Sequence, residues 1–288
     1  MPSLKKLLDK YNFRPGKQLG QNFLNDPGIS EMIVKLSGVS KADVVLEIGA
    51  GPGVLTVPFA LKAKKVYAVE KDVRLAHILK AEIYIRGILN TEVIEKDFLQ
   101  VNIEDLAKNY KDKIIAAGNL PYNISSQILI KLAMSRKSIR RAVVMLQKEL
   151  AHRILEKPGS KEYGRISVVM QYFSDLKKLM EVGAEKFYPK PKVDSTVLLI
   201  DFKERPDSPA DNLELFFKTV KAAFSHRRKT LKNALKGSEL HLESDIADDL
   251  LKKADIDPGR RAESLEIDEF VRLSNIISFY ALNASSFT

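Results

Sequence analysis

The fold of this chain is decided by one stretch, Val44-Val45-Leu46-Glu47-Ile48-Gly49-Ala50-Gly51-Pro52-Gly53. Its first five residues are mostly apolar and β-branched, as expected for a strand that is buried in a parallel sheet with helices on both faces. Three glycines spaced two apart follow, and they permit a tight turn in which backbone N–H groups can approach a ligand. An amphipathic stretch (54–62) comes next. The pattern predicts a nucleotide-like cofactor at the carboxyl end of this strand, where open α/β sheets bind their ligands.

Strand-like and helix-like segments alternate around this stretch. We expect parallel strands over 44–48, 65–70, 91–95, 114–118 and 141–146. Between and before them we expect helices over 3–11, 26–36, 54–62, 72–86 and 126–135. Helices over 148–156 and 165–174 follow, and the runs 177–182 and 193–202 are expected to pair antiparallel at the sheet edge. This alternation indicates βαβ units and an α/β fold.

Composition excludes several classes of protein. The 288 residues include no Cys, which excludes a disulfide scaffold, a thiolate metal site and a Cys nucleophile. The N-terminus lacks the apolar core of a signal peptide, and no run approaches the ~18 apolar residues of a membrane span. The four histidines lack metal-ligand spacing, so no metal site is expected. We expect a monomeric cytoplasmic protein without a membrane partner.

The charge is distributed unevenly along the chain. The net charge is +10, and residues 1–204 carry 34 Lys and Arg against 23 Asp and Glu, whereas residues 205–288 carry 13 against 14. A basic N-terminal part favours a polyanionic partner, nucleic acid before membrane. The segment 205–210 is typical of a linker, and helices are expected after it over 213–224, 243–254 and 267–281. The prediction is therefore a main α/β domain (1–204) with an N-terminal arm, and a small all-α domain (205–288).

Two acidic residues narrow the choice of cofactor. Val54 stands where the dinucleotide fingerprint requires its last glycine, so the glycine turn alone fits either NAD or S-adenosylmethionine. Glu70 ends the second strand, where an acid can bind both hydroxyls of a ribose. Asp97 and Phe98 follow the third strand, where the carboxylate can accept from an adenine amino group and the ring can lie near the base. An acid after each of these strands is the arrangement of S-adenosylmethionine-dependent methyltransferases.

The fourth strand end indicates the reaction. There Asn119-Leu120-Pro121-Tyr122 follows an apolar run, and methylation of an exocyclic amine needs acceptors that hold its N–H groups. The Asn119 side-chain oxygen and the backbone carbonyl of Leu120 or Pro121 can serve. Tyr122 offers a face on which a base stacks, worth about 1–3 kcal/mol, and Phe187 could close the other face. No strong general base is required, because catalysis of this kind is mainly positioning.

The segment before the first buried strand has two interpretations. Gln18-Leu-Gly-Gln-Asn-Phe-Leu24 combines a glycine, polar amides and two apolar residues, which is typical of a loop. It could be a surface arm. It could instead be a flap over the cofactor pocket, with Asn22 and the backbone of Leu24 as polar contacts.

The chain resembles a known family, the ribosomal RNA adenine dimethyltransferases of the small ribosomal subunit. The resemblance covers nearly the whole chain and rests on these motifs: Gln18–Leu24, Leu46–Gly53, Asn119–Tyr122, Met145–Glu149, Tyr163–Arg165, Phe187–Ser195, Phe224–Thr230 and Arg261–Leu265. One departure is His226, where the family most often has Gln.

The resemblance implies an activity and a set of residues. The family uses S-adenosylmethionine to place two methyl groups on the 6-amino group of each of two adjacent adenosines, in the hairpin loop near the 3′ end of the small-subunit rRNA, and acts on the immature subunit. It implies a Rossmann-like class I methyltransferase sheet. The implied cofactor contacts are Asn22, Leu24, Gly49, Gly51, Glu70, Asp97 and Asn119, with Glu47 and Phe98 lining the same pocket.

Other functions stay open at this point. The erythromycin-resistance methyltransferases, which act on large-subunit rRNA, share the N-terminal motifs, while Phe224–Thr230 and Arg261–Leu265 favour the small-subunit enzyme. A dinucleotide-dependent oxidoreductase would not explain Asn119–Tyr122. A non-catalytic ribosome-assembly factor with a vestigial pocket is the third possibility.

The C-terminal part carries a segregated charge. Residues 217–236 hold seven basic residues and no acid: Lys218, Lys221, Arg227, Arg228, Lys229, Lys232 and Lys236. Residues 239–257 hold seven acids against two lysines. We expect the first segment to face RNA phosphates and the acidic segment to face away from it or toward a protein. The alternative is an ordinary solvated helix face.

Overall fold

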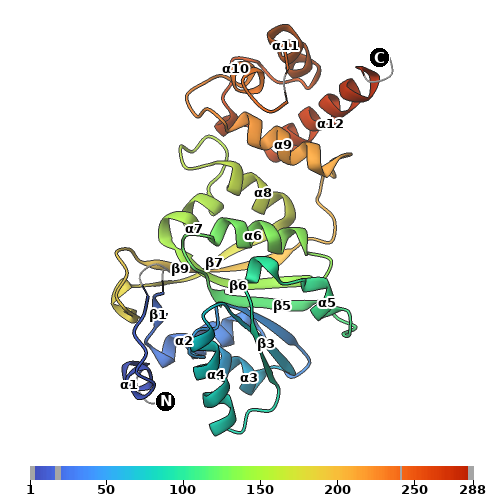
Figure 1. Ribbon diagram of the computed structural model, residues 1–288. Helices are drawn as coiled ribbons and strands as arrows, with labels where there is room; N and C mark the ends of the chain where they lie inside the picture. Colours follow the sequence, from blue (N-terminus) through green and yellow to red (C-terminus); the bar gives the residue numbers. More distant parts are fainter. Residues whose placement is uncertain (1–3, 17–20, 241, 285–288) are drawn as a thin grey trace. The chain divides into compact units, whose positions relative to one another are not determined.

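The computed structural model describes residues 4–16, 21–240 and 242–284 (Figure 1). The chain divides into two compact units. The first contains the described residues up to Ala151 together with Ser174–Glu204, and the second contains His152–Phe173 and the described residues from Arg205 onward. Residues 152–173 were expected within the first domain, and the structure groups them with the C-terminal helices instead.

A seven-stranded sheet runs through the first unit in the order β4-β3-β2-β5-β6-β9-β7. Adjacent strands from β4 to β6 are parallel, while β9 is antiparallel to both β6 and β7. The strands of this sheet are β2 (Val44–Ile48), β3 (Lys65–Glu70), β4 (Thr91–Glu95), β5 (Ile114–Asn119), β6 (Ile139–Gln147), β7 (Ser174–Val182) and β9 (Ser195–Phe202). All seven expected strands are thus confirmed within a few residues, including the antiparallel pair at the edge.

Helices and one short second sheet complete the first unit. The helices are α1 (Leu4–Lys10), α2 (Pro27–Ser37), α3 (Thr56–Lys62), α4 (Val73–Ile85), η2 (Phe98–Gln100), α5 (Ile103–Ala107), α6 (Ser125–Met134) and η3 (Ala184–Lys186), and α7 (Lys148–Leu155) spans the boundary between the units. The second sheet pairs β1 (Phe23–Leu24) with β8 (Phe187–Tyr188). The pattern did not predict α5, β1 or β8, because segments of two to five residues show no periodicity.

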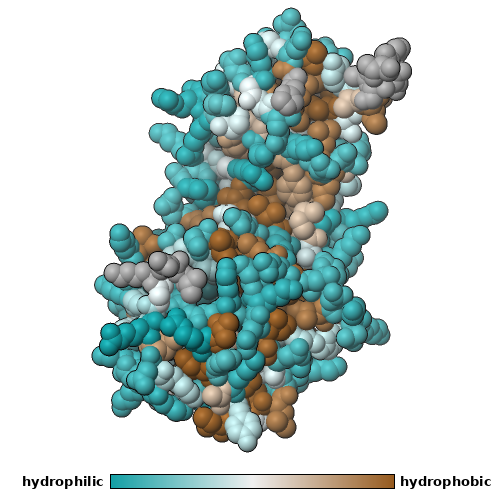
Figure 2. Space-filling model, in the orientation of Figure 1, coloured by the Kyte–Doolittle hydropathy of each residue, from teal (hydrophilic) through white to brown (hydrophobic). Residues whose placement is uncertain are grey.

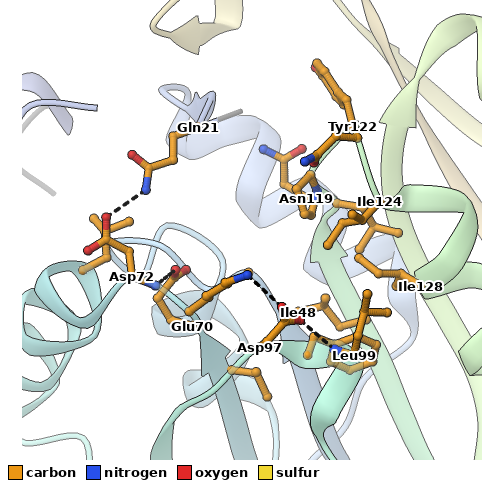
Figure 3. Close-up of a pocket in the computed structure, with 18 of the residues that line it drawn as sticks. Gln21, Ile48, Glu70, Asp72, Asp97, Leu99, Asn119, Tyr122, Ile124 and Ile128 are labelled. Atoms are coloured by element: carbon orange, nitrogen blue, oxygen red, sulfur yellow. Dashed lines mark hydrogen bonds and ion pairs between the residues drawn. The ribbon is translucent and has the colours of Figure 1, made fainter. Parts of the chain in front are cut away.

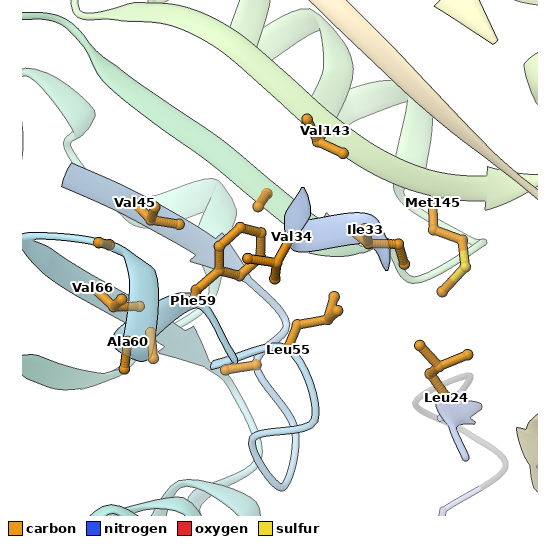
Figure 4. Close-up of a cluster of buried hydrophobic side chains, with 14 of the residues drawn as sticks. Leu24, Ile33, Val34, Val45, Leu55, Phe59, Ala60, Val66, Val143 and Met145 are labelled. Atoms are coloured by element: carbon orange, nitrogen blue, oxygen red, sulfur yellow. The ribbon is translucent and has the colours of Figure 1, made fainter. Parts of the chain in front are cut away.

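The core of the first unit forms around β2. All five residues of β2 are buried, as expected for a central parallel strand. Phe59 of α3 and Val34 of α2 pack with Val45 and Val66 in one buried cluster, which reaches Val143 and Met145 of β6 and Leu24 of β1 (Figure 4). This packing fixes the ends of the central strands and the turns that follow them.

The second unit is helical. Its elements are α8 (Arg165–Phe173), α9 (Leu213–Ala223), α10 (Leu231–Lys236), α11 (Ser244–Lys253), η4 (Ala262–Ser264) and α12 (Ile267–Ala284). Tyr172 of α8 stacks on Phe216 of α9 at 4.4 Å, and Phe224 stacks on Phe270 of α12 at 5.7 Å. These aromatic contacts explain why α8 belongs with the C-terminal helices although it precedes β7 in the chain.

The surface of the chain is mostly hydrophilic on the face shown in Figure 2, where hydrophobic side chains gather in separate patches. Across the described residues, every helix is too short or too polar to span a bilayer.

Candidate active site

A cavity lies where four adjacent parallel strands end (Figure 3). Its walls include Ile48 and Gly49 at the end of β2, Glu70–Asp72 at the end of β3, Lys96–Leu99 after β4 and Asn119–Ile124 at the end of β5. Gln21, Asn22 and Phe23 of the N-terminal arm form a further wall. The structure therefore brings together the four strand ends and the part of the arm that the sequence predicted, while residues 17–20 of the arm lie outside the described residues.

Two glycines allow the arm and the strand ends to pack this closely around the cavity. Gly51 has φ +56°, and a Cβ there would lie 3.0 Å from the Phe23 ring. A Cβ on Gly118 would lie 2.4 Å from the carbonyl oxygen of Ile48, so only glycine permits β5 to lie this close to β2 at that point. Asn119 is consequently placed beside the glycine turn, with its carbonyl oxygen 3.7 Å from the position a Cβ of Gly49 would take.

Glu70 is buried at the end of β3, where it organises the glycine turn. One carboxylate oxygen accepts from the backbone N–H of Gly51 and the other from that of Asp72, each at 2.8 Å. Burial raises the pKa of Glu70, although these backbone donors oppose the rise. Each oxygen is left with a lone pair that can accept a further hydrogen bond. A vicinal pair of ribose hydroxyls is the complement of such a carboxylate.

Asp97 is held in a similar way after β4. Its carboxylate accepts from Lys71 Nζ at 2.8 Å and from the Leu99 backbone N–H at 2.9 Å. The Lys71 ammonium and the Leu99 N–H lower the pKa of Asp97. Phe98 beside it is buried, and Lys131 Nζ of α6 lies 5.7 Å from the centre of its ring. An ionised acceptor next to a buried ring suits the amino group and face of an adenine.

Glu47 does not line the cavity, in contrast to the expectation. Its side chain is 1% exposed, and its register partners are Ala68 and Ala117 on the neighbouring strands. Because Glu47 precedes the strand end, its side chain lies within the buried sheet and not at the edge. Burial raises its pKa to about 8, and its Oε2 atom has no hydrogen-bond partner among the described residues. Glu47 is therefore a buried, protonated carboxyl group at neutral pH.

Leu24 and Gly51 contribute differently from expectation. Neither lines the cavity wall. Leu24 is buried in the core cluster, where its backbone pairs with Phe187. Gly51 shapes the site indirectly, since its N–H binds Glu70.

Asn119 carries the clearest chemical feature of the cavity. Its Nδ2 donates to the backbone carbonyl of Asn22 at 2.8 Å. Because a carbonyl can only accept, this bond fixes which end of the amide is Nδ2. The Oδ1 atom is buried and has no hydrogen-bond partner among the described residues. Buried acceptors are almost always satisfied, so an open one in a cavity wall indicates a place for a ligand donor.

The residues after Asn119 supply a second acceptor. The Pro121 carbonyl already accepts from Ser125 Oγ at 2.8 Å and from the Ile124 N–H at 3.2 Å. The Leu120 N–H donates to the Met145 carbonyl at 3.0 Å, which fixes the Leu120 peptide on β6. Of the two carbonyls that the sequence left open, that of Leu120 is therefore the better placed to accept from a substrate.

Tyr122 is oriented by a residue distant in sequence. Its hydroxyl and Ser195 Oγ lie 3.0 Å apart and share a hydrogen bond. Ser195 is fully buried at the start of β9, and burial raises the pKa of Tyr122. The ring of Tyr122 is thus held in the cavity wall, where it can stack on a base.

Phe187, the second aromatic expected beside the base, does not line the cavity in the free protein. It is 4% exposed and belongs to the core cluster, and it is not part of the cavity wall. The antiparallel pairing of β8 with β1 places Phe187 opposite Leu24, and both side chains enter the core. The structure therefore places Tyr122, but not Phe187, in the cavity wall of the free protein.

Several residues of the wall were missed by the sequence reasoning. Gln21 donates to the Asp72 carboxylate at 3.1 Å, and Asp72 caps the N-terminus of α4. Lys71, Ile124 and Ile128 also line the cavity. The position of Asp72, two residues after an acidic strand end and before a helical pattern, is the signal that could have identified it as a cap.

The basic segment of the second unit is partly neutralised. Lys218 pairs with Glu214 at 2.7 Å, Lys221 with Glu239 at 2.6 Å and Lys232 with Asp248 at 3.1 Å. The expectation that the acidic segment faces away is wrong for Glu239 and Asp248. The loop residues Arg227, Arg228 and Lys229 are exposed, and none of them has an ion-pair partner among the described residues.

A metal site would need several ligands close together. In the part of the chain that the structure describes, no three His, Asp or Glu side chains gather in an arrangement that could hold an ion.

Comparison with known proteins agrees with this geometry. The family model for ribosomal RNA adenine dimethylase matches residues 12–278. The chain belongs to this family. It is 48% identical over 271 residues to ribosomal RNA small subunit methyltransferase A of Desulforapulum autotrophicum, covering 94% of this chain and 95% of the relative. It is 40% identical over 273 residues to the protein of that name from Clostridium botulinum, covering 95% and 98%.

Solved structures give the same assignment of fold. A dimethyladenosine transferase from Plasmodium falciparum superposes with a TM-score of 0.74 at 29% identity, covering 87% of this chain and 95% of that chain. The 23S rRNA methyltransferase ErmE superposes with a TM-score of 0.63 at 24% identity, covering 89% and 99%, which shows a shared fold. The first unit of this family member therefore has the class I methyltransferase fold.

Proposed function

We propose that this protein transfers methyl groups from S-adenosylmethionine to the 6-amino group of adenosine in small-subunit ribosomal RNA. Membership in the ribosomal RNA adenine dimethylase family supports the reaction, and the names of the relatives support the small-subunit substrate. The observation that carries the proposal is the buried, unpartnered Oδ1 of Asn119, in the wall of the cavity that Glu70 and Asp97 also line.

The residues of the cavity fit the proposed cofactor. Glu70 would accept from the two ribose hydroxyls, because its two oxygens keep acceptor capacity beside the Gly51 and Asp72 N–H groups. Asp97 would accept from the adenine amino group, and Phe98 would lie near the ring. When bound, S-adenosylmethionine would supply an electrophilic methyl group.

Asn119 and Leu120 would hold the target amine. Two acceptors, Asn119 Oδ1 and the Leu120 carbonyl, would take its two N–H hydrogens and so turn its lone pair out of conjugation with the purine ring. The nitrogen then becomes a better nucleophile and is aimed by the protein. Nδ2 of Asn119 is already bound to Asn22, so this orientation exists before the substrate arrives. Such preorganised contacts are the main source of catalysis where no covalent intermediate is needed.

No side chain with the role of a strong general base is required. The amine gains positive charge as the new C–N bond forms, so its proton becomes acidic and leaves readily to water or a nearby acceptor. The hydroxyl of Tyr122 has a raised pKa and is engaged with Ser195, so Tyr122 serves as a stacking surface and not as a base.

The finer details follow from the family resemblance. We propose that two adjacent adenosines in the 3′-terminal hairpin loop are each methylated twice, in the immature small subunit, and that the enzyme acts as a monomer. Residues 1–204 would carry catalysis, apart from 152–173, which pack with the helical unit. The helical unit would contact the RNA, through the exposed Arg227, Arg228 and Lys229.

Transfer of tritium from labelled S-adenosylmethionine to immature small subunits, followed by mapping of the modified base, tests the proposal. Label on the 6-amino groups of two adjacent adenosines near the 3′ end of the small-subunit rRNA is the expected result. Label on large-subunit rRNA would favour the erythromycin-resistance type. If wild-type protein binds subunits but transfers no label, an assembly factor is favoured, and a rise in melting temperature with NAD in place of S-adenosylmethionine would favour an oxidoreductase.

A further inference from the structure

The N-terminal arm joins the two sides of the cavity through consecutive residues. Gln21 Nε2 donates to Asp72 Oδ2 at 3.1 Å, and the next residue, Asn22, accepts from Asn119 Nδ2 at 2.8 Å. Figure 3 shows Gln21 and Asp72 on the opposite side of the cavity from Asn119 and Tyr122. Two consecutive residues of the arm therefore link Asp72, which lies next to Glu70, with Asn119, which would hold the amine.

The Asp72 side of this link is rigid. The Asp72 backbone N–H donates to Glu70 Oε1 at 2.8 Å, and its Oδ1 caps α4 by accepting from the Arg74 N–H at 3.0 Å. Although partial burial opposes ionisation, hydrogen bonds from Arg74 and Gln21 keep the pKa of Asp72 below its ordinary value. Asp72 is thus an ionised, fixed acceptor, and Gln21 is attached to it by a charge-assisted hydrogen bond.

The other amide atom of Gln21 is also engaged. Its Oε1 accepts from the Gly16 N–H at 2.8 Å. Gln21 therefore uses both ends of its amide, one toward the arm itself and one toward α4. A side chain with this pair of contacts fixes the peptide that follows it.

We propose that Gln21 is a positioning residue for methyl transfer, acting through Asn22 and Asn119. Its bond to Asp72 holds the Asn22 carbonyl where Asn119 Nδ2 can donate to it, which leaves Asn119 Oδ1 free for the substrate amine. Without that bond the Asn22 carbonyl shifts, and Asn119 loses the contact that fixes its amide. The inference rests on the proposed function only for its catalytic readout, because the link between Gln21 and Asn119 exists in the free protein.

The central test replaces Gln21 by Met, which keeps the length of the side chain and removes both hydrogen bonds. We expect kcat for methyl transfer to fall by about 10- to 100-fold, since small misplacements of a reacting group have effects of this size. KM for the RNA and the dissociation constant of S-adenosylmethionine should change by less than about threefold, because a positioning residue acts on the transition state and not on ground-state binding. The matched control is Gln100→Met, an exposed glutamine of the same unit outside the cavity wall, which should leave kcat unchanged.

A second readout needs neither substrate nor cofactor. The side-chain amide of Asn119 can be observed by NMR in the free protein and assigned from its absence in Asn119→Ser. In Gln21→Met we expect its protons to exchange with water at least several-fold faster, and in Gln100→Met to exchange at the wild-type rate.

A final experiment exchanges the hydrogen-bond donor and acceptor between positions 21 and 72. In Gln21→Glu the two carboxylates repel, and in Asp72→Asn the acceptor charge is lost, so each single change should lower kcat. In the double variant an Asn side chain at position 72 can donate to a Glu at position 21, and kcat should recover at least tenfold over the worse single variant. Unchanged kcat and amide exchange in Gln21→Met, or a loss confined to cofactor affinity, would overturn the inference. A wild-type protein that transfers no methyl group would overturn the proposed function instead, and the amide exchange would still decide the positioning.

Discussion

The two ends of the cavity differ in how their polar groups are satisfied. At the end proposed for the cofactor, each oxygen of Glu70 and of Asp97 already accepts from a donor in its own or the neighbouring strand-end loop. At the amine end, Asn119 Oδ1 is buried without a partner among the described residues, and its amide is held by Asn22, 97 positions earlier in the chain. The cofactor end is thus stable on its own, whereas the amine end is incomplete until a donor arrives.

This difference has a thermodynamic meaning. An unsatisfied buried acceptor destabilises the fold by about 1–3 kcal/mol, and such a defect persists where function needs it. This free energy is recovered when a substrate amine donates a hydrogen bond to Asn119 Oδ1, in a site that already has the right geometry. Groups left without a partner in the free protein are therefore expected to be those that contact the substrate.

The largest effect is expected from Asn119→Ala. The change removes the open acceptor at the amine end and should lower kcat by about 10²–10³-fold, the size seen when one preorganised hydrogen-bonding group is lost from an active site. Binding of RNA should persist, because the proposed phosphate contacts are in the helical unit. Steady-state kinetics with isolated subunits and a filter-binding measurement provide the check, and a variant with kcat within threefold of wild type would mean that Asn119 does not hold the amine.

Glu47→Gln tests the buried carboxyl group of β2, which does not line the cavity. Burial raises its pKa to about 8, from an ordinary value of 4.5. Between these values the unfolded chain loses the proton first, so this group stabilises the fold fully below pH 4.5 and that stability is lost as the pH rises to about 8. Gln cannot ionise, so the variant should gain a few kcal/mol over wild type at pH 9 and little at pH 4.5.

Urea denaturation at the two pH values measures this gain. Glu70, whose raised pKa acts in the same direction, is present in both proteins, so its own burial cancels from the difference and only its repulsion with the Glu47 carboxylate is removed by the substitution. Equal differences in unfolding free energy at the two pH values would show that Glu47 does not titrate in this range.

The same contrast explains what the sequence could predict. Glu70 and Asp97 follow strands in a pattern that repeats along the chain, so their place at one sheet edge was predictable from local periodicity. The contacts that orient the amine end join residues far apart in sequence, such as Ser195 with Tyr122, and no local pattern records them. Phe187 and Glu47 were wrongly placed in the pocket because whether a side chain near a strand end points to the edge or into the core depends on tertiary packing.

The helical unit shows the same limit. The segregation of charge over 217–236 and 239–257 is visible in the sequence, but the ion pairs of Lys221 with Glu239 and of Lys232 with Asp248 depend on how the helices fold back on one another. The grouping of 152–173 with the C-terminal helices likewise depends on aromatic contacts between segments about 45 positions apart.

A smaller effect is expected at Tyr122. Tyr122→Ala should lower kcat/KM by a factor that corresponds to about 1–3 kcal/mol, the range for loss of stacking on one base. Tyr122→Phe keeps the ring. In Tyr122→Phe and in Ser195→Ala the ring loses only the hydrogen bond that orients it, so each should cost about 0.5–1.5 kcal/mol. Kinetics of the three variants separate the two roles, and a Tyr122→Phe variant as impaired as Tyr122→Ala would show that the hydroxyl, and not the ring face, is what matters.

The smallest effect on catalysis is expected in the helical unit, where basic residues without an ion-pair partner can be compared with basic residues that have one. Arg227, Arg228 and Lys229 are exposed without ion-pair partners among the described residues, whereas Lys218, Lys221 and Lys232 are paired with acids. Replacing Arg227, Arg228 and Lys229 by Ala should leave kcat unchanged and reduce the slope of log K against log salt by about 0.7–0.9 for each lost phosphate contact.

Replacing the three paired lysines by Ala changes the net charge equally, so this triple variant is the matched control. Its slope should fall less, because each paired lysine must leave an acid before it can bind a phosphate. Equal slopes in the two triple variants would show that RNA binding responds to the total charge of the unit, and that the exposed loop is no special contact.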